Sequence, residues 1–141
     1  MSRLFGIRCE NKYYQLEELE DKDTCTTELF LKADRTIEFG ETDGPLWAAA
    51  VGTWDVKPNT NDYSMTITRT FETGSKGREM GEFAYDLVRR FEGDMSMVGE
   101  SVAIGGLVYA TLNDDGDELP AGYFNMIDAT VERQGDDKKV A

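Results

Sequence analysis

Residues 52–73 read GTWDVKPNTNDYSMTITRTFET, and residues 82–93 read EFAYDLVRRFEG. From Tyr63 to Phe71, every second residue is large and apolar apart from Arg69, and the residues between them are serine or threonine. This alternation has the two-residue period of a β-strand, whose successive side chains point to opposite faces. The second stretch has the same period, so we predict two successive strands that pair with each other.

Shorter segments with strand character flank these two. TTELFLK and TIEFG, joined by a turn at residues 33–35, predict a hairpin, and GTWDV, SVAIGGLVYATL and GYFNMIDATV predict three further strands. No crossover helix separates these strands, so we expect sequence neighbours to pair antiparallel. We therefore predict an all-β fold, a single antiparallel meander barrel or strongly curled sheet of about seven or eight strands, because closure removes exposed edges.

The 141 residues match the size of one domain. The run LEELE at residues 16–20 favours helix, so we expect a short N-terminal helix or cap within residues 1–24. Residues 25–131 are then the β-barrel domain, and residues 132–141 form a charged tail. The pair Gly105-Gly106 predicts either a bulge or a close approach by another backbone or a ligand.

The chain is strongly acidic, with 28 acidic and 15 basic residues, a net charge of −13 and a pI of about 4.3. Such a field repels phosphate backbones and anionic lipid, so we expect no nucleic-acid partner and no binding to membrane surfaces. No apolar run is long enough for a transmembrane segment. We expect a soluble protein of the cytoplasm or of an organelle interior, and a plastid location stays open if a transit peptide is removed.

Groups that usually carry catalysis are missing from the sequence. There is no histidine, and the chain lacks G-x-S-x-G, a phosphate-binding glycine loop and C-x-x-C. The run from Asn113 to Glu118 lacks the glycine and glutamate positions of a calcium loop and predicts a hairpin turn. We expect no enzyme, no catalytic residue, no metal site and no cofactor.

The two cysteines, Cys9 and Cys25, are too few for a disulfide framework and lack metal-binding spacing. We expect two reduced, half-buried thiols, with a Cys9–Cys25 bridge as the alternative.

Arg69 and Arg89 fall, by parity, on the apolar faces of the two long strands. A buried guanidinium needs a partner because an uncompensated buried charge costs several kcal/mol. We expect an internal salt bridge, for example to Asp55 or Glu38, or stacking on Trp54. The alternative is that the two arginines hold the carboxylate of an otherwise apolar ligand.

Gly52-Thr53-Trp54 resembles the G-x-W of the calycin group, which comprises lipocalins, fatty-acid-binding proteins and avidins. In that group an arginine stacks on the tryptophan, and the motif opens the first strand, whereas a hairpin precedes it here. The paired arginines Arg69 and Arg89, with Tyr85 nearby, are similar to the carboxylate anchor of fatty-acid-binding proteins. The chain also resembles small acidic β proteins of algal plastids.

Two functions follow from these patterns. The first is a non-enzymatic binding module that holds a small apolar or carboxylate-bearing molecule, with Trp54, Arg69, Tyr85 and Arg89 as its ligand-binding residues. It predicts an interior cavity of several hundred Å³. A barrel whose interior is filled by its own side chains would have no such cavity. The side chains that could fill it are those of Phe71, Phe83, Phe91 and Met65.

The second function is that of an accessory or assembly protein that docks on a larger protein complex, which the plastid resemblance would place in photosynthesis. It predicts an exposed apolar or aromatic patch on the surface, formed by Tyr13, Tyr14 and Trp47. The protein would then be a subunit of a complex, whereas the first function allows a monomer.

Overall fold

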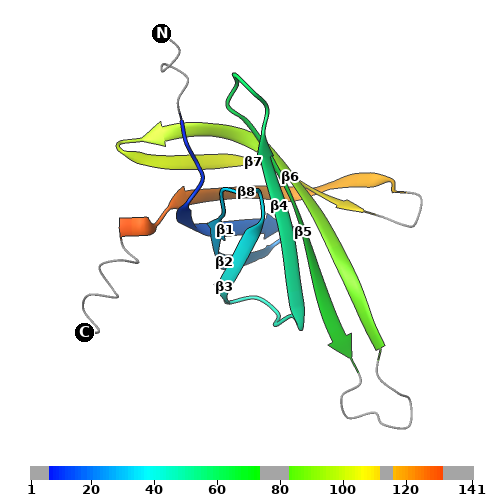
Figure 1. The fold of residues 1–141 in the computed structure, drawn as a ribbon. Helices are drawn as coiled ribbons and strands as arrows, with labels where there is room; N and C mark the ends of the chain where they lie inside the picture. The colour runs from blue at the N-terminus through cyan, green and yellow to red at the C-terminus, as the bar shows by residue number, and fades with distance from the viewer. Residues whose placement is uncertain (1–6, 74–82, 112–115, 132–141) are drawn as a thin grey trace, which may run out of the picture.

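The computed structural model describes residues 7–73, 83–111 and 116–131 of the chain. These residues form eight β-strands (Figure 1). The strands are β1 (Lys12–Glu20), β2 (Asp23–Leu31), β3 (Ile37–Thr42), β4 (Ala49–Val56), β5 (Asp62–Thr73), β6 (Phe83–Val98), β7 (Ser101–Thr111) and β8 (Glu118–Asp128). The prediction of an all-β antiparallel fold is confirmed. No helix in these parts of the chain is long and apolar enough to cross a membrane.

All eight strands belong to one sheet in the order β3-β2-β1-β8-β7-β6-β5-β4, and every neighbouring pair is antiparallel. Consecutive strands therefore pair with each other, except β3 and β4, and the ladder between β1 and β8 joins the first strand to the last. The ends of the sheet, β3 and β4, meet without a ladder. They are joined by an isolated bridge between Thr36 and Thr53, and the backbone N–H of Trp54 donates to the Arg35 carbonyl at 3.0 Å. We call this contact the seam of the nearly closed barrel.

The predicted N-terminal helix is wrong, because residues 12–20 form strand β1. Its alternate residues Tyr14, Leu16 and Glu18 are buried inside the barrel, while the residues between them face outward. Pairing with β2 on one edge and β8 on the other satisfies the strand backbone. This tertiary pairing outweighs the helix propensity of leucine and glutamate. The barrel therefore begins at Lys12, inside the segment for which a helix or cap was expected.

Other boundaries also differ from the sequence prediction. Strand β6 continues past the predicted EFAYDLVRRFEG to Val98, and β8 begins at Glu118, within the segment predicted as a turn. The segment between the two long predicted strands, GSKGREMG at residues 74–81, is predicted to be a loop from its glycines and polar residues; it lies outside the described residues, as do the first part of the predicted turn near Asn113 and the charged tail at 132–141.

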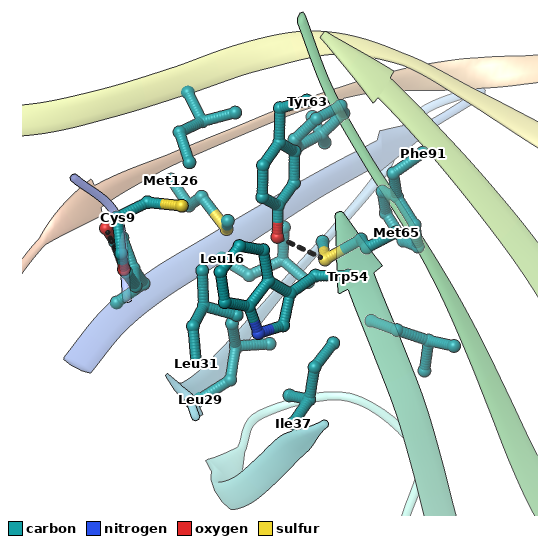
Figure 2. Close-up of a cluster of buried hydrophobic side chains, with 14 of the residues drawn as sticks. Cys9, Leu16, Leu29, Leu31, Ile37, Trp54, Tyr63, Met65, Phe91 and Met126 are labelled. Carbon is teal, nitrogen blue, oxygen red and sulfur yellow. Dashed lines mark hydrogen bonds between the residues drawn. The ribbon is translucent and has the colours of Figure 1, made fainter. Parts of the chain in front are cut away.

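Buried side chains fill one end of the barrel, which we call the core end (Figure 2). The Trp54 and Tyr63 rings stack with centroids 6.4 Å apart, and the Tyr63 hydroxyl donates to the Met65 sulfur at 3.2 Å. Around them lie the other core residues, which are Cys9, Tyr14, Leu16, Leu29, Leu31, Ile37, Ile67, Phe91, Met95, Val102, Ile104, Val108, Phe124 and Met126. The predicted inward face of β5 is confirmed by the burial of Tyr63, Met65 and Ile67.

Gly106, the second glycine of the pair in β7, lies where another backbone approaches closely. A Cβ on Gly106 would overlap with the carbonyl oxygen of Glu92 on β6. The irregularity between β7 and β8 lies at Val108 and Tyr109, so the glycine pair itself is not a bulge. Of the two predicted roles, close approach by a neighbouring backbone is the one that the structure has.

Candidate functional site

The opposite end of the barrel contains a cavity of about 280 Å³. We call this end the pocket end. The β1–β2 hairpin, the loop between β3 and β4, the last part of β5 and the first part of β6 surround the cavity. The lining residues are Glu18, Glu20, Asp21, Asp23, Cys25, Thr42, Pro45, Trp47, Arg69, Phe71, Leu87 and Arg89.

Arg69 enters this cavity from β5 and binds Glu18 of β1. Its two terminal nitrogens donate to the Glu18 carboxylate at 2.6 and 3.3 Å. The side chains are 12% and 6% exposed, respectively, and the Arg69 guanidinium lies 5.5 Å from the centre of the Trp47 ring. β1 and β5 are not neighbours in the sheet, so this pair connects strands through the barrel interior.

Arg89 of β6 binds Glu20, which lies two residues after Glu18 on β1. Arg89 Nε and Nη2 donate to the Glu20 carboxylate at 3.0 and 3.3 Å, and Nη1 donates to the Val88 carbonyl at 3.3 Å. The expectation of internal salt bridges is confirmed for both arginines.

The partners expected for these arginines are wrong. Asp55 lies 3.6 Å from Arg35, and Glu38 lies 3.6 Å from Lys32, and both carboxylates are exposed. Asp55 follows inward-facing Trp54, so strand parity turns it outward. The real partners lie on β1, the segment that was predicted to be helical.

Trp54 does not line the cavity. It is buried at the core end, where its indole N–H donates to the Lys32 carbonyl at 3.0 Å. The arginine that stacks on it is Arg35, with the guanidinium 4.5 Å from the ring centre, instead of Arg69 or Arg89. A Cβ on Gly52 would lie 2.9 Å from the Ile37 side chain, so this glycine gives β3 room at the seam. The G-x-W residues thus close the core end.

Tyr85 is also outside the cavity lining. Its side chain is 44% exposed and stacks on Phe71, with ring centroids 5.7 Å apart. Of the four predicted ligand-binding residues, the structure brings Arg69 and Arg89 together in the cavity and places Tyr85 at its flank, while Trp54 lies at the core end.

Sequence reasoning missed Glu18, Glu20 and Trp47 as lining residues. The alternation of Tyr14, Leu16 and Glu18 contains the signal for the first, because a strand with two inward apolar residues carries Glu18 on the same face. Trp47 lies in the loop between β3 and β4, where no periodicity fixes its direction.

Both cysteines are free thiols, and only Cys25 lines the cavity. Its sulfur lies 3.6 Å from the Thr42 hydroxyl. Cys9 is buried at the core end, and burial raises the pKa of its thiol to about 11. The expectation of half-buried thiols therefore holds for Cys25, whereas Cys9 is fully buried.

The predicted surface patch of Tyr13, Tyr14 and Trp47 does not form. Tyr14 faces the core, where its hydroxyl donates to the Cys9 carbonyl at 2.9 Å. Tyr13 packs on Phe30, with ring centroids 4.7 Å apart.

The outer face instead carries a row of three exposed apolar side chains, one from each of three neighbouring strands. Leu19 lies opposite Tyr123, which lies opposite Leu107. We call these three residues the outer row.

Together these features describe an antiparallel up-and-down β-barrel, nearly closed, with a packed core at one end and a cavity at the other. Comparisons of the chain with models of protein families, with curated proteins and with solved structures find no match.

Proposed function

We propose that the protein is a non-enzymatic binding module, a calycin-like barrel that holds a small, mostly apolar molecule at its pocket end. The observation that carries this proposal is the cavity of about 280 Å³, which lies at the opposite end of the barrel from the cluster of buried core residues. Ligand pockets for drug-sized molecules begin at about 300 Å³, so the ligand is a small one.

The walls of the cavity suit an apolar ligand. Phe71 and Leu87 line it from the neighbouring strands β5 and β6, and Pro45 and Trp47 line it from the loop that connects β3 to β4. Apolar surface on both the protein and the ligand would leave water on binding, at roughly 25 cal/mol for each Å² buried.

Two features support the calycin-like part of the proposal. Consecutive strands other than β3 and β4 pair with each other, as in up-and-down barrels that hold ligands. Arg35 stacks on Trp54 of the G-x-W at the closed end.

The paired arginines favour an apolar ligand over a carboxylate-bearing one. Arg69 and Arg89 already bind Glu18 and Glu20. A ligand carboxylate would have to displace one of these glutamates, which would then lack a partner and lie near two further carboxylates of the cavity lining, Asp21 and Asp23.

A pair of matched variants tests the binding function. Leu87 is 40% exposed on the cavity wall, and Leu107 is 38% exposed on the outer face of β7. Leu87→Trp should fill the cavity, whereas Leu107→Trp adds the same side chain elsewhere. The protein is isolated gently from its own cells and measured by native mass spectrometry. We expect a bound small molecule on the wild type and on Leu107→Trp, and none on Leu87→Trp.

A bare wild-type protein, or a ligand retained equally by both variants, would contradict binding in this cavity. Unfolding curves of the two variants show whether each one remains folded.

The outer row favours a second candidate function, that of an accessory protein that docks on a larger complex. Leu19, Tyr123 and Leu107 form adjacent cross-strand pairs on an otherwise acidic protein. The expected result is migration in a large assembly that Tyr123→Glu abolishes and Leu87→Trp preserves. Migration of the wild type as a monomer in a fresh lysate would count against it.

A further inference from the structure

We propose that the ligand of the pocket end carries a positive charge, as an apolar molecule with one protonated amine at its exposed end. This inference rests on the proposed binding function and names the class of ligand. Its basis is the distribution of charge along the depth of the cavity.

The deep charges of the cavity are already compensated. Arg69 and Glu18 form a nearly buried pair, and the flat face of Trp47 lies over the same guanidinium. Arg89 donates to both Glu20 oxygens and to the Val88 carbonyl. The inner wall therefore presents paired charges and apolar side chains to a ligand.

The mouth of the cavity carries carboxylates that no positively charged side chain of the lining neutralises. Four carboxylates and two guanidiniums line the whole cavity, so two negative charges remain after the two pairs form. The excess comes from the side chains of Asp21 and Asp23 in the β1–β2 hairpin, and neither carboxylate forms a hydrogen bond or ion pair within the described part of the chain. Lys22 belongs to the same turn but does not line the cavity.

This arrangement complements an amphiphilic cation. An ammonium group at the mouth would face Asp21 and Asp23 while the attached apolar part contacts Phe71, Leu87 and Trp47. The net charge of −13 also raises the local concentration of cations and repels anions. A carboxylate of the same size would meet the opposite field.

Three eight-carbon probes that differ only in their head group test the inference, namely octylamine, octanol and octanoate. The readout at pH 7 is the rate at which an aromatic disulfide reagent modifies Cys25, the free thiol of the cavity. Cys9 is buried, and the Cys25→Ser variant supplies its background rate. We expect octylamine to protect Cys25 at an about five-fold lower concentration than octanol, and octanoate to protect least. Added salt should narrow the difference between amine and alcohol.

A double variant assigns the preference to the mouth. Asp21→Asn with Asp23→Asn removes two charges, and asparagine tolerates the positive φ of 55° at residue 21. Asp62→Asn with Asp94→Asn removes the same charge from exposed positions that lie opposite each other on β5 and β6, away from the cavity. The first double variant should bind octylamine and octanol equally, and the second should keep the preference.

The outcomes separate this inference from the function beneath it. If none of the three probes protects Cys25, binding at the pocket end is wrong, and the charge preference with it. If octanol or octanoate protects as well as octylamine in the wild type, only the positive charge of the ligand is wrong. A preference that survives in Asp21→Asn/Asp23→Asn also overturns the inference, because the mouth would not be its cause.

Discussion

Arg69 and Glu18 are 51 residues apart in the sequence, and their side chains meet inside the barrel at 2.6 Å. Arg69 lies on β5 and Glu18 on β1, and these strands do not pair in the sheet, so this ion pair links opposite parts of the barrel wall. The ion pair also forms the boundary between the packed core and the cavity. Two residues before Arg69 on β5 lies Ile67, and two residues before Glu18 on β1 lies Leu16, and both of these side chains are fully buried.

Removing one partner of this pair should destabilise the protein strongly. Arg69→Met leaves the Glu18 carboxylate buried without compensation, and we expect the free energy of unfolding to fall by about 3–5 kcal/mol. Urea unfolding followed by circular dichroism measures it. The double variant Glu18→Leu/Arg69→Met should regain most of the loss, because no buried charge is left. Equal losses in the single and double variants would show that packing, and not charge, explains the effect.

The neighbouring pair supplies a comparison. Arg89 and Glu20 are more exposed, with side chains 20% and 30% accessible. Arg89→Met should therefore reduce stability by about 1 kcal/mol, since water screens the charge that remains. The same urea experiment checks the order of the two variants.

The adjacent glycines of β7 should respond very differently to the same substitution. A Cβ on Gly106 would overlap with the Glu92 carbonyl, whereas a Cβ on Gly105 would meet nothing closer than 3.4 Å. We expect Gly106→Ala to reduce stability by about 3 kcal/mol or more, because backbone must move. Gly105→Ala should stay within about 0.5 kcal/mol of the wild type. Thermal unfolding of the two variants tests this, and similar melting temperatures would contradict it.

Alkaline pH should destabilise the fold through its buried acidic protons. Burial raises the pKa of Cys9 from 9.0 to about 11, and it also raises the pKa values of Tyr14 and Tyr63 above 10. The folded state then holds protons that the unfolded state releases, so the contribution of these three groups to stability is complete below about pH 9 and is lost as the pH rises above it. By pH 11 the Cys9 contribution to this loss is about 2–3 kcal/mol.

Unfolding measured at fixed pH values between 8 and 11 tests this prediction, with the hydroxyl-free variant Tyr63→Phe as a comparison. That variant should show a shallower decline above pH 10, because one buried ionisable group is gone. A flat profile from pH 8 to 11 would mean that the buried groups reach water without unfolding.

The two tryptophans should have separate roles. Trp54→Phe removes the hydrogen bond to the Lys32 carbonyl and part of the core at the seam, so we expect a loss of about 2–3 kcal/mol in stability. Trp47 is half-buried in the cavity wall, so Trp47→Phe should reduce the free energy of unfolding by less than about 1 kcal/mol. It should instead speed the modification of Cys25. Chemical unfolding and thiol labelling of both variants check the assignment.

Much of the fold could be predicted because period-two alternation determines which side chains point inward. Tyr63, Met65 and Ile67 are buried as their parity indicates, and the same argument placed Arg69 on the inner face. Pairing between chain neighbours then follows from the absence of crossover helices.

The candidate site was harder to predict, because its decisive contacts are not local. Glu18 was hidden in LEELE, whose helix propensity is overcome only by pairing with β2 and β8. The choice between Glu18 and Asp55 as a partner for Arg69 depends on the strand order across the barrel, which parity alone does not give. The missing ladder between β3 and β4 likewise depends on how far the sheet coils, and no residue pattern in β3 marks it.

The ladder between β1 and β8 has a consequence for biosynthesis. During translation, β1 leaves the ribosome with one edge whose partner is still unmade, since Leu16 lies opposite Met126. Until β8 is synthesised, the sheet of β1, β2 and β3 has two unpaired edges, one on β1 and one on β3. We therefore expect slow, late folding and a risk that these edges pair with other nascent chains. A circular permutant that opens the chain at residues 43–48 and joins the original ends would make β8 and β1 in succession. Such a permutant would turn the slowest pairing of the natural order into a local one.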